Sequence, residues 1–162
     1  MTDIGQDPTD YFVQPLAIIL CGIPASGKTT YSDNLPFSFM SLSRDAIRDK
    51  LFGKKYKMSK EGEQHVTDSF NNHFEYFTKY NDNIVIDNTH CREKYLDEVI
   101  EKLQSKHYRI YIKRFDTPVW LCRIREVKRR FFTGKKVPHS VIKNMHKNYK
   151  QINWDKYKKY IL

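Results

Sequence analysis

Short apolar segments recur along the chain at positions that predict the strands of a buried sheet. Residues 16–21 form a continuous apolar run, which is typical of a strand covered on both faces of a parallel sheet. Residues 108–113 alternate apolar and polar side chains, as a half-buried strand does. Two shorter candidates lie between them, at residues 38–42 and 83–86. The pattern therefore predicts a sheet of about four strands.

Amphipathic segments fill the intervals between these strands. Within residues 91–104, four apolar side chains follow the i, i+3, i+4, i+7 spacing of one helix face: Leu96, Val99, Ile100 and Leu103. Further helices are expected at 58–80, as one long helix or two short ones, from an N-cap and first-position proline at Thr117-Pro118 to about Arg130, and from Pro138 onward. Strands that alternate with helices favour βαβ units, so we expect an α/β fold with a parallel sheet.

Length and patterning bound the domain organisation. The 162 residues suit one domain, for which we expect a polar tail at 1–14, the folded domain at 15–150 and a basic, aromatic extension at 151–162. No segment approaches the roughly 18 uncharged apolar residues of a membrane span, and the acidic N-terminus does not resemble a signal peptide. The three cysteines are widely spaced and form no CxxC pair. These features predict a cytoplasmic protein without a membrane partner.

The net charge of +10 is distributed very unevenly. Residues 1–104 carry 12 basic and 16 acidic side chains, whereas residues 105–162 carry 17 basic and 3 acidic ones. Such a one-sided charge attracts polyanions, but a solvated lysine-rich surface explains the same composition. Charge alone therefore leaves both interpretations open.

A phosphate-binding motif follows the first predicted strand. Residues 22–29 read GIPASGKT, which matches GxxxxGK[ST] in the strand–loop–helix context that the motif requires. Backbone N–H groups of such a loop cradle phosphate oxygens, and the following helix adds the positive end of its dipole. We expect Lys28 to bridge the β- and γ-phosphates of an NTP such as ATP, and Thr29 to offer its hydroxyl to Mg²⁺.

Two carboxylates are further candidates. Asp87 follows the apolar run at residues 83–86, where ligands bind in open α/β sheets, and is expected to hold Mg²⁺ or a water bound to it. The alternative is a capping residue for the helix at 91–104. Asp45 lies in the first turn of a helix that Ser43 caps, where its charge also suits the helix dipole. Arg48 lies on the same helical face, so Asp45 and Arg48 could meet one ligand.

A dense cationic segment at about 123–137 is predicted to form a lid over the phosphates. Its cations are Arg123, Arg125, Lys128, Arg129, Arg130, Lys135 and Lys136. Phe131 and Phe132 could stack on a nucleobase, although packing of the lid onto the core is the commoner fate of such residues. Residues 131–137 also have the character of a linker, since they contain the sole glycine after residue 62.

Four blocks of sequence together resemble the 5′-kinase domain of phage polynucleotide kinase and its bacterial RNA-repair relatives. They are GIPASGKTT at 22–30, SRDAIR at 43–48, VIDNTH at 85–90 and FDTPVWLCRIREVKRR, which begins at 115 and is followed by the Val-Pro at 137–138. The resemblance covers about residues 18–149 and implies the P-loop NTPase/kinase fold with strand order 2-3-1-4. It leaves residues 150–162 outside, and we expect no counterpart of the phage enzyme's phosphatase domain within these 162 residues.

The resemblance also implies roles for particular residues. Asp45 would be the general base for the acceptor 5′-hydroxyl, Arg48 would contact the acceptor phosphate, and Arg125 and Arg129 would hold the NTP phosphates. The nucleotide-binding set is then Gly22, Ala25, Ser26, Gly27, Lys28, Thr29, Thr30, Arg125 and Arg129. Two positions depart from the family pattern. Glu126 replaces a common asparagine, which predicts an outward-facing position, and Asp87-Asn88-Thr89 replaces Asp-Thr-Asn.

The sequence therefore predicts a kinase that transfers the γ-phosphate of an NTP to the 5′-hydroxyl of DNA or RNA, with Mg²⁺ as cofactor. Lys28, Asp45 and Arg129 are the expected catalytic residues, and basic residues such as Lys143 and Lys147 are expected to follow the polymer backbone. One alternative is a P-loop kinase of a small metabolite or nucleoside, which would share the same site. Another is a non-catalytic nucleic-acid-binding protein that retains an NTP site.

Overall fold

A four-stranded parallel sheet forms the centre of the computed structural model, which describes residues 14–54, 57–134 and 137–162. Its strands are β1 (Leu16–Cys21), β2 (Phe39–Leu42), β3 (Asn83–Asp87) and β4 (Arg109–Arg114), in the spatial order β2-β3-β1-β4. All three strand pairings are parallel. The predicted α/β fold and its strand order are confirmed. Residues 1–13 of the predicted tail, and Lys135 and Lys136 of the predicted lid, lie outside the described residues.

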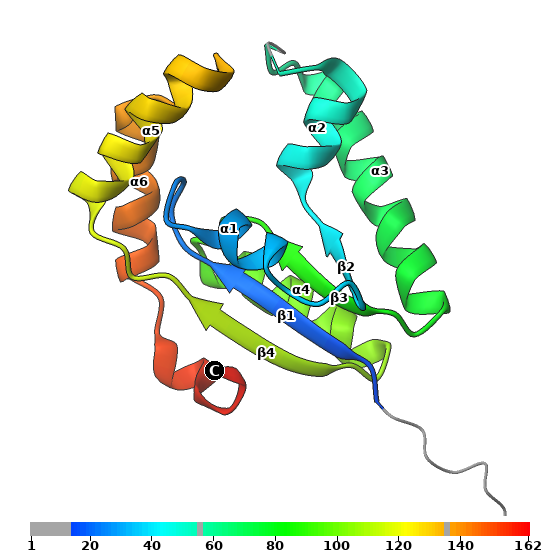
Figure 1. Ribbon diagram of the computed structural model, residues 1–162. Helices are drawn as coiled ribbons and strands as arrows, with labels where there is room; N and C mark the ends of the chain where they lie inside the picture. The colour runs from blue at the N-terminus through cyan, green and yellow to red at the C-terminus, as the bar shows by residue number, and fades with distance from the viewer. Residues whose placement is uncertain (1–13, 55–56, 135–136) are drawn as a thin grey trace, which may run out of the picture.

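Helices cover the sheet unequally (Figure 1). The helices α3 (Lys60–Lys79) and α4 (Glu93–Ser105) help to bury the face that carries Ile19, Ile84 and Ile112. The opposite face has a smaller core around Ile18, Leu20 and Val85, beneath the short α1 (Lys28–Asp33). Both faces of β1 are buried, which explains its continuous apolar run as predicted.

Two pairs of helices flank the carboxyl ends of the strands (Figure 1). In Figure 1, α2 (Arg44–Phe52) and α3 stand on one side, and α5 (Val119–Thr133) and α6 (His139–Lys150) stand on the other. Of the two arrangements considered for residues 58–80, the single long helix is the one observed, and Leu96, Val99, Ile100 and Leu103 are buried in α4 as predicted. Ligands of open α/β sheets bind at this edge.

The boundaries of α5 differ from the expectation at both ends. Pro118 is the N-cap residue, and Thr117 instead donates a hydrogen bond from its hydroxyl to the carbonyl oxygen of Ser26, at 2.8 Å. The helix continues through Thr133 and ends at Gly134, whose φ of 70° is the left-handed conformation that glycine adopts without strain. Residues 131–133 are therefore helical and not a linker.

Residues 151–162 pack against the domain. A 3₁₀ helix, η1 (Trp154–Tyr160), buries Tyr157, whose hydroxyl donates to Asp97 on α4 at 2.8 Å. Ile161 then forms a parallel bridge with Ile112 of β4. Within the described ranges, every helix is too short or too polar to cross a membrane.

Candidate active site

The loop between β1 and α1 has the backbone that phosphate binding requires. At Gly22 a Cβ atom would lie 2.7 Å from the Ser26 hydroxyl oxygen and 2.9 Å from the Phe115 Cβ, so no side chain fits there. Gly27 has a φ of 107°, and Ala25 has a φ of 60°. Both values lie in the left-handed region, which is uncommon for a residue other than glycine. The loop is therefore tightly turned, as a backbone cradle for phosphate must be.

Lys28 is turned back into this loop. Its ammonium nitrogen donates to the carbonyl oxygens of Gly22, at 3.0 Å, and Ile23, at 2.9 Å. Burial lowers the pKa of Lys28, and the charge of Asp87 opposes that shift. The side chain is held by acceptors that an anion could replace, at the position where the motif expects the β- and γ-phosphates.

Thr29 and Asp87 meet at the carboxyl end of β3. The Thr29 hydroxyl donates to a carboxylate oxygen of Asp87, at 2.7 Å. Burial raises the pKa of Asp87, whereas the hydrogen bond from Thr29 lowers it. The capping interpretation of Asp87 is wrong, because Arg92 is the N-cap residue of α4. In the described ranges no three acidic, histidine or cysteine side chains gather as metal ligands. Mg²⁺ needs fewer protein groups, and a hydroxyl and a carboxylate beside phosphate oxygens fit its usual ligand set.

Asp45 and Arg48 form a unit on the first turns of α2. The Ser43 hydroxyl accepts from the Ala46 N–H, at 3.3 Å, and so begins the helix as predicted. Asp45 is exposed and forms an ion pair with Arg48. Glu63 of α3 then holds Arg48 through two parallel hydrogen bonds of 2.7 and 2.9 Å. The hydrogen bonds from Arg48 lower the pKa of Glu63.

Glu63 was not anticipated from the sequence. It contacts Arg48 across the α2–α3 interface and also lies 3.4 Å from Arg44, so that with Asp45 four side chains share one charge network. The only local signal was a glutamate in the first turn of a helix, which suits the helix dipole in any protein. Its partner 15 residues away could not be read from that signal.

The two lid arginines contact different groups. Arg125 donates from its guanidinium to the carbonyl oxygen of Ala25 in the phosphate-binding loop, at 3.3 Å. Arg129 donates to Glu126, at 3.0 Å. The expected outward-facing position of Glu126 is wrong, because its side chain is buried and also accepts from the Val137 N–H, at 3.0 Å. The half-buried Val137 N–H before α6 thus has its acceptor in the buried Glu126 side chain.

The predicted packing of Phe131 and Phe132 onto the core is also wrong. They are 86% and 88% exposed at the end of α5. The helix carries both residues beyond the part of α5 that packs on the domain, where Cys122 and Glu126 are its buried residues.

One cavity of about 500 Å³ unites most of the predicted site residues. Its polar lining comes from the phosphate-binding loop, β3, α2 and α5, and its apolar wall from α6, the α5–α6 connection and Met58. The predicted residues that line it are Ala25, Lys28, Thr29, Asp45, Arg48, Asp87 and Arg129. Gly22, Ser26 and Gly27 shape the loop beside it, Thr30 is exposed on α1, and Arg125 reaches the loop from α5. We call this cavity the central cleft.

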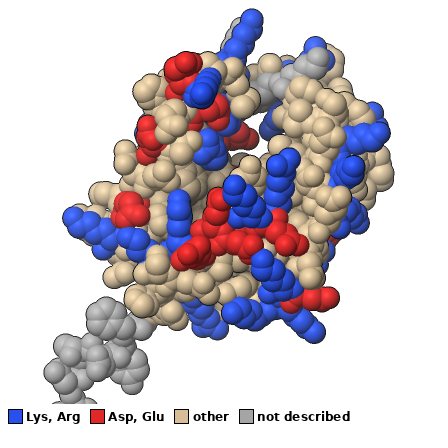
Figure 2. Space-filling model, turned by 180° about the vertical axis from the view of Figure 1, so that it is seen from behind, with Lys and Arg blue, Asp and Glu red and all other residues tan. Residues whose placement is uncertain are grey.

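The helix α4 exposes both acidic and basic side chains, whereas the charged residues of α6 are all basic. Figure 2, a view from behind, shows acidic side chains gathered at the centre of that face. The helix α4 contributes Glu98 and Glu101 as exposed acidic residues. In contrast, α6 exposes Lys143, Lys147 and Lys150. Two of the basic residues expected to follow a polymer, Lys143 and Lys147, are thus accessible.

Comparisons with solved structures find the same architecture. A chain of the Pnkp1/Rnl/Hen1 RNA repair complex is 26% identical with a TM-score of 0.78, and the match covers 94% of this chain and 49% of that one. A second structure of that complex gives 27% identity, a TM-score of 0.62 and coverage of 69% and 39%. The chain therefore spans about half or less of the length of these relatives. A chain of the PezAT toxin–antitoxin system of Streptococcus pneumoniae shares the fold at 16% identity, with a TM-score of 0.69 and coverage of 92% and 67%.

Comparisons of sequence place the chain in a family. No curated protein is significantly similar to it. A family model described as AAA domain matches residues 18–152, which contain the phosphate-binding loop, the central cleft and both lid arginines. The match and the strand order agree with the predicted P-loop kinase fold, and the RNA-repair neighbours agree with a domain of the polynucleotide kinase type. The chain belongs to this AAA domain family.

Proposed function

We propose that the protein is a polynucleotide 5′-hydroxyl kinase, which transfers the γ-phosphate of ATP or another NTP to the 5′ end of DNA or RNA. The observation that carries the proposal is the content of the central cleft, where Asp45 and Arg48 line the same cavity as Lys28 and Arg129. A proton acceptor and a phosphate-binding arginine thus share one cavity with the donor-phosphate site.

The acceptor side is built on α2. An acceptor phosphate next to the reacting nucleotide would bind the Arg48 guanidinium, which Glu63 already orients in a bidentate geometry. Asp45, which lies beside Arg48, would accept the proton of the attacking hydroxyl. General-base assistance of this kind typically contributes about 10²–10⁴ in rate.

The donor side is built on the phosphate-binding loop. Lys28 would exchange its carbonyl acceptors for phosphate oxygens, and Arg129 would leave Glu126 to stabilise charge on the transferring group. Thr29 and Asp87 would hold Mg²⁺, whose charge neutralises phosphate oxygens when it is bound. Phosphoryl transfer depends mainly on such positioning and charge stabilisation.

A polymeric acceptor would account for the excess of basic residues in the segment 105–162. Lys143 and Lys147 are exposed on α6, which contributes Val141 and Met145 to the wall of the cleft. Both lysines lie on the side of α6 away from Val141 and Met145, so a polymer whose 5′ end is in the cleft would pass around α6 to bring its backbone phosphates to them. The two similar chains from an RNA repair complex support the same class of substrate.

A kinase of a nucleoside or another small metabolite is the second candidate. A cavity of about 500 Å³ lies within the size range of small-molecule sites. In that case the same donor residues would act, and the exposed lysines of α6 would have no part in substrate binding.

A transfer assay with γ-labelled ATP and Mg²⁺ separates the candidates. The acceptors are 5′-hydroxyl oligonucleotides of DNA and of RNA, a nucleoside, and the same oligonucleotides with a 5′-phosphate. We expect label on the 5′-hydroxyl oligonucleotides and far less on the nucleoside. Equal or better transfer to the nucleoside would favour the metabolite kinase, and ATP binding without transfer to any acceptor would contradict both candidates.

The variant Asp45→Asn completes the experiment. It keeps the size of the side chain and removes the proton acceptor, so transfer should fall by about 10²–10⁴ while ATP affinity stays near that of the wild type. Full transfer activity with a lowered melting temperature would mean that Asp45 serves only the dipole of α2.

A further inference from the structure

The outer face of α5 carries an unusual row of exposed apolar side chains. Trp120, Ile124, Val127 and Phe131 are 62%, 48%, 57% and 86% exposed. Their spacing is i, i+4, i+7, i+11, and at about 100° per residue they lie within an arc of about 60° on the helix. Single exposed apolar residues are ordinary, but four on one helix face form a contiguous patch. We call them the outer α5 stripe.

This stripe lies opposite the side of α5 that packs on the domain. The buried residues of the helix are Cys122 and Glu126. Arg125 and Arg129, which reach the phosphate-binding loop and the central cleft, lie on a different face from the stripe. The stripe is therefore no part of the core, and it does not belong to the cleft.

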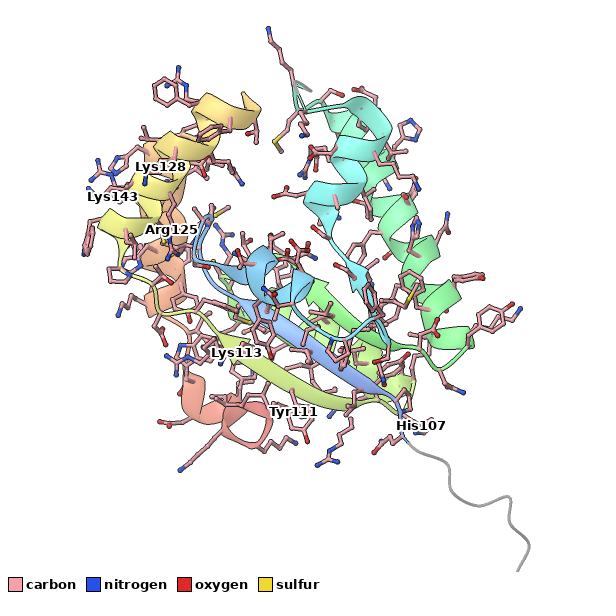
Figure 3. The ribbon with its side chains drawn as sticks, in the orientation of Figure 1. His107, Tyr111, Lys113, Arg125, Lys128 and Lys143 are labelled. Atoms are coloured by element: carbon pink, nitrogen blue, oxygen red, sulfur yellow. The ribbon has the colours of Figure 1, made fainter. Side chains whose placement is uncertain are left out.

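Cations border the stripe on both sides. Arg123 and Arg130 follow one edge and Lys128 the other, and all three are exposed. None of the three has an ion pair with a residue in the described part of the chain. Figure 3 shows Lys128 and Lys143 on the flank that α5 and α6 form. The single acidic residue of α5 is Glu126, which is buried.

A shallow groove continues the apolar surface toward α6. A cavity of about 220 Å³ is lined by Val127 of the stripe, by Val137, His139 and Ile142, and by the charged Arg123, Glu126 and Arg130. The stripe and this groove thus form one apolar surface with a cationic border. The stripe extends over 12 residues, from Trp120 to Phe131, or about 17 Å, which corresponds to three turns of a partner helix.

We infer that the outer α5 stripe binds an amphipathic helix of a partner protein, with the partner's apolar residues on the stripe and its acidic residues on Arg123, Lys128 and Arg130. Apolar anchors at i, i+4 and i+7 are the pattern by which a helix lies against another helix or in a groove. The cationic border selects an acidic partner by charge complementarity. Because α5 carries Arg125 and Arg129 on another face, such a partner would lie on the lid of the proposed kinase, and its binding does not depend on which acceptor the kinase uses.

Two other occupants fit the surface less well. A second copy of the chain, with its α5 packed antiparallel on this one, would bring the cations of both helices together without an exposed acidic side chain on either. A nucleic acid would meet the cations, but its bases stack on aromatic or guanidinium planes. The centre of the stripe consists of Ile124 and Val127, whose branched side chains suit packing against a protein helix.

The test uses the full chain and a synthetic peptide as the probe. The peptide has leucine at i, i+4, i+7 and i+11 and glutamate on the flanking positions. Its controls are a scrambled peptide of the same composition, the same peptide with lysine for glutamate, and an oligothymidylate. Fluorescence anisotropy measures binding to the wild type, to the double variant Ile124→Ser/Val127→Ser and to Tyr95→Ser, which alters an exposed aromatic residue of α4 as a matched control.

We expect the acidic amphipathic peptide to bind the wild type and Tyr95→Ser equally, and to bind the double variant at least about tenfold more weakly. Lys128→Glu should weaken binding and reduce its salt dependence. The double variant should keep its thermal stability and its ATP binding, since the stripe lies outside the core and the cleft.

Four results would overturn the inference. They are the absence of peptide binding, equal binding of the scrambled peptide, oligothymidylate binding that the double variant loses, and a wild-type dimer in sedimentation that the double variant converts to a monomer. The third result would assign the stripe to nucleic acid, and the fourth would assign it to a second copy of the chain.

Discussion

Lys28 shows how a single residue can be held ready for a ligand. Its ammonium group is buried and hydrogen-bonded to two carbonyl oxygens of its own loop, so it is already in place when phosphate arrives. The residue belongs to the motif that was readable from the sequence, because the motif fixes local geometry through neighbours within six residues. Local motifs of this kind need no knowledge of tertiary contacts.

The substitution Lys28→Met tests this role. It keeps the length of the side chain and removes the charge, so the domain should remain folded while phosphoryl transfer falls below detection. Circular dichroism and thermal unfolding check the fold, and the transfer assay with labelled ATP checks activity. Near-normal transfer by a folded Lys28→Met protein would contradict the assignment of the phosphate-binding loop.

His90 makes stability depend on pH. It is buried, and its Nδ1–H donates to the carbonyl oxygen of Leu20 at 3.0 Å. Burial lowers the pKa of His90 from 6.5 to about 4. In the unfolded chain His90 therefore binds a proton below about pH 6.5, whereas in the folded chain it binds one only below about pH 4. Stability is fully present above pH 6.5 and is lost as the pH falls, by about 2 kcal/mol at pH 5.

Urea unfolding of the wild type and of His90→Asn at pH 7 and pH 5 measures this contribution. Asparagine tolerates the left-handed backbone of this position, where φ is 40°, and has no titrating ring. We expect the free energy of unfolding to fall by about 2 kcal/mol less in His90→Asn than in the wild type between the two pH values. An equal fall in both proteins would show that His90 does not titrate on unfolding.

At the scale of elements, α5 separates what was predictable from what was not. Its existence followed from the start signal at Thr117-Pro118, but its first residue is Val119 and its last is Thr133. The Thr117 hydroxyl donates a hydrogen bond to the carbonyl oxygen of Ser26, 91 residues away, and does not cap α5. Glu126 and Glu63 are explained in the same way, because each is held by a partner on another segment.

Glu126 should stabilise the connection between α5 and α6. In Glu126→Ala the half-buried Val137 N–H loses its charged acceptor, which costs about 1–3 kcal/mol. In Glu126→Gln the amide oxygen can still accept from Val137, so the loss should stay below about 1 kcal/mol. Chemical unfolding of both variants measures the difference, with Glu98→Ala on the exposed face of α4 as the matched control. Equal stability of Glu126→Ala and the wild type would contradict this role.

At the scale of the whole molecule, the sheet order and the layers agree with the prediction because they depend on periodicity and on family resemblance. The central cleft was less predictable than the sheet. Residues of β3, α2, α5, α6 and the loop after β1 line it together, and these elements are far apart in the sequence. The sequence predicted its polar residues one motif at a time. It did not predict the apolar wall, where Met58, Val137, Val141 and Met145 line the cavity, because their exposure to the cleft depends on how α6 and the segments before α3 and α6 pack.

If Arg129 contacts the transferring phosphate and Lys143 contacts the polymer backbone, variants of these two residues should have different effects on transfer. Arg129→Ala should lower kcat on short and long acceptors alike, at any salt concentration, because Arg129 would touch the transferring phosphate. Lys143→Ala should weaken only long acceptors, and the slope of log affinity against log salt should fall by about 0.7–0.9. Kinetics of both variants on a dinucleotide and on a long 5′-hydroxyl oligonucleotide, at two salt concentrations, measure these effects. Equal loss on both lengths in Lys143→Ala would contradict the division.

The position of the transferred phosphate tests the central claim most directly. A 5′-hydroxyl oligonucleotide is incubated with γ-labelled ATP, Mg²⁺ and the protein, and is then digested to single nucleotides so that the labelled one is identified. The account predicts label on the 5′-terminal nucleotide alone, and none when the oligonucleotide already carries a 5′-phosphate. Label at the 3′ end, or transfer that a 5′-phosphate does not block, would contradict it.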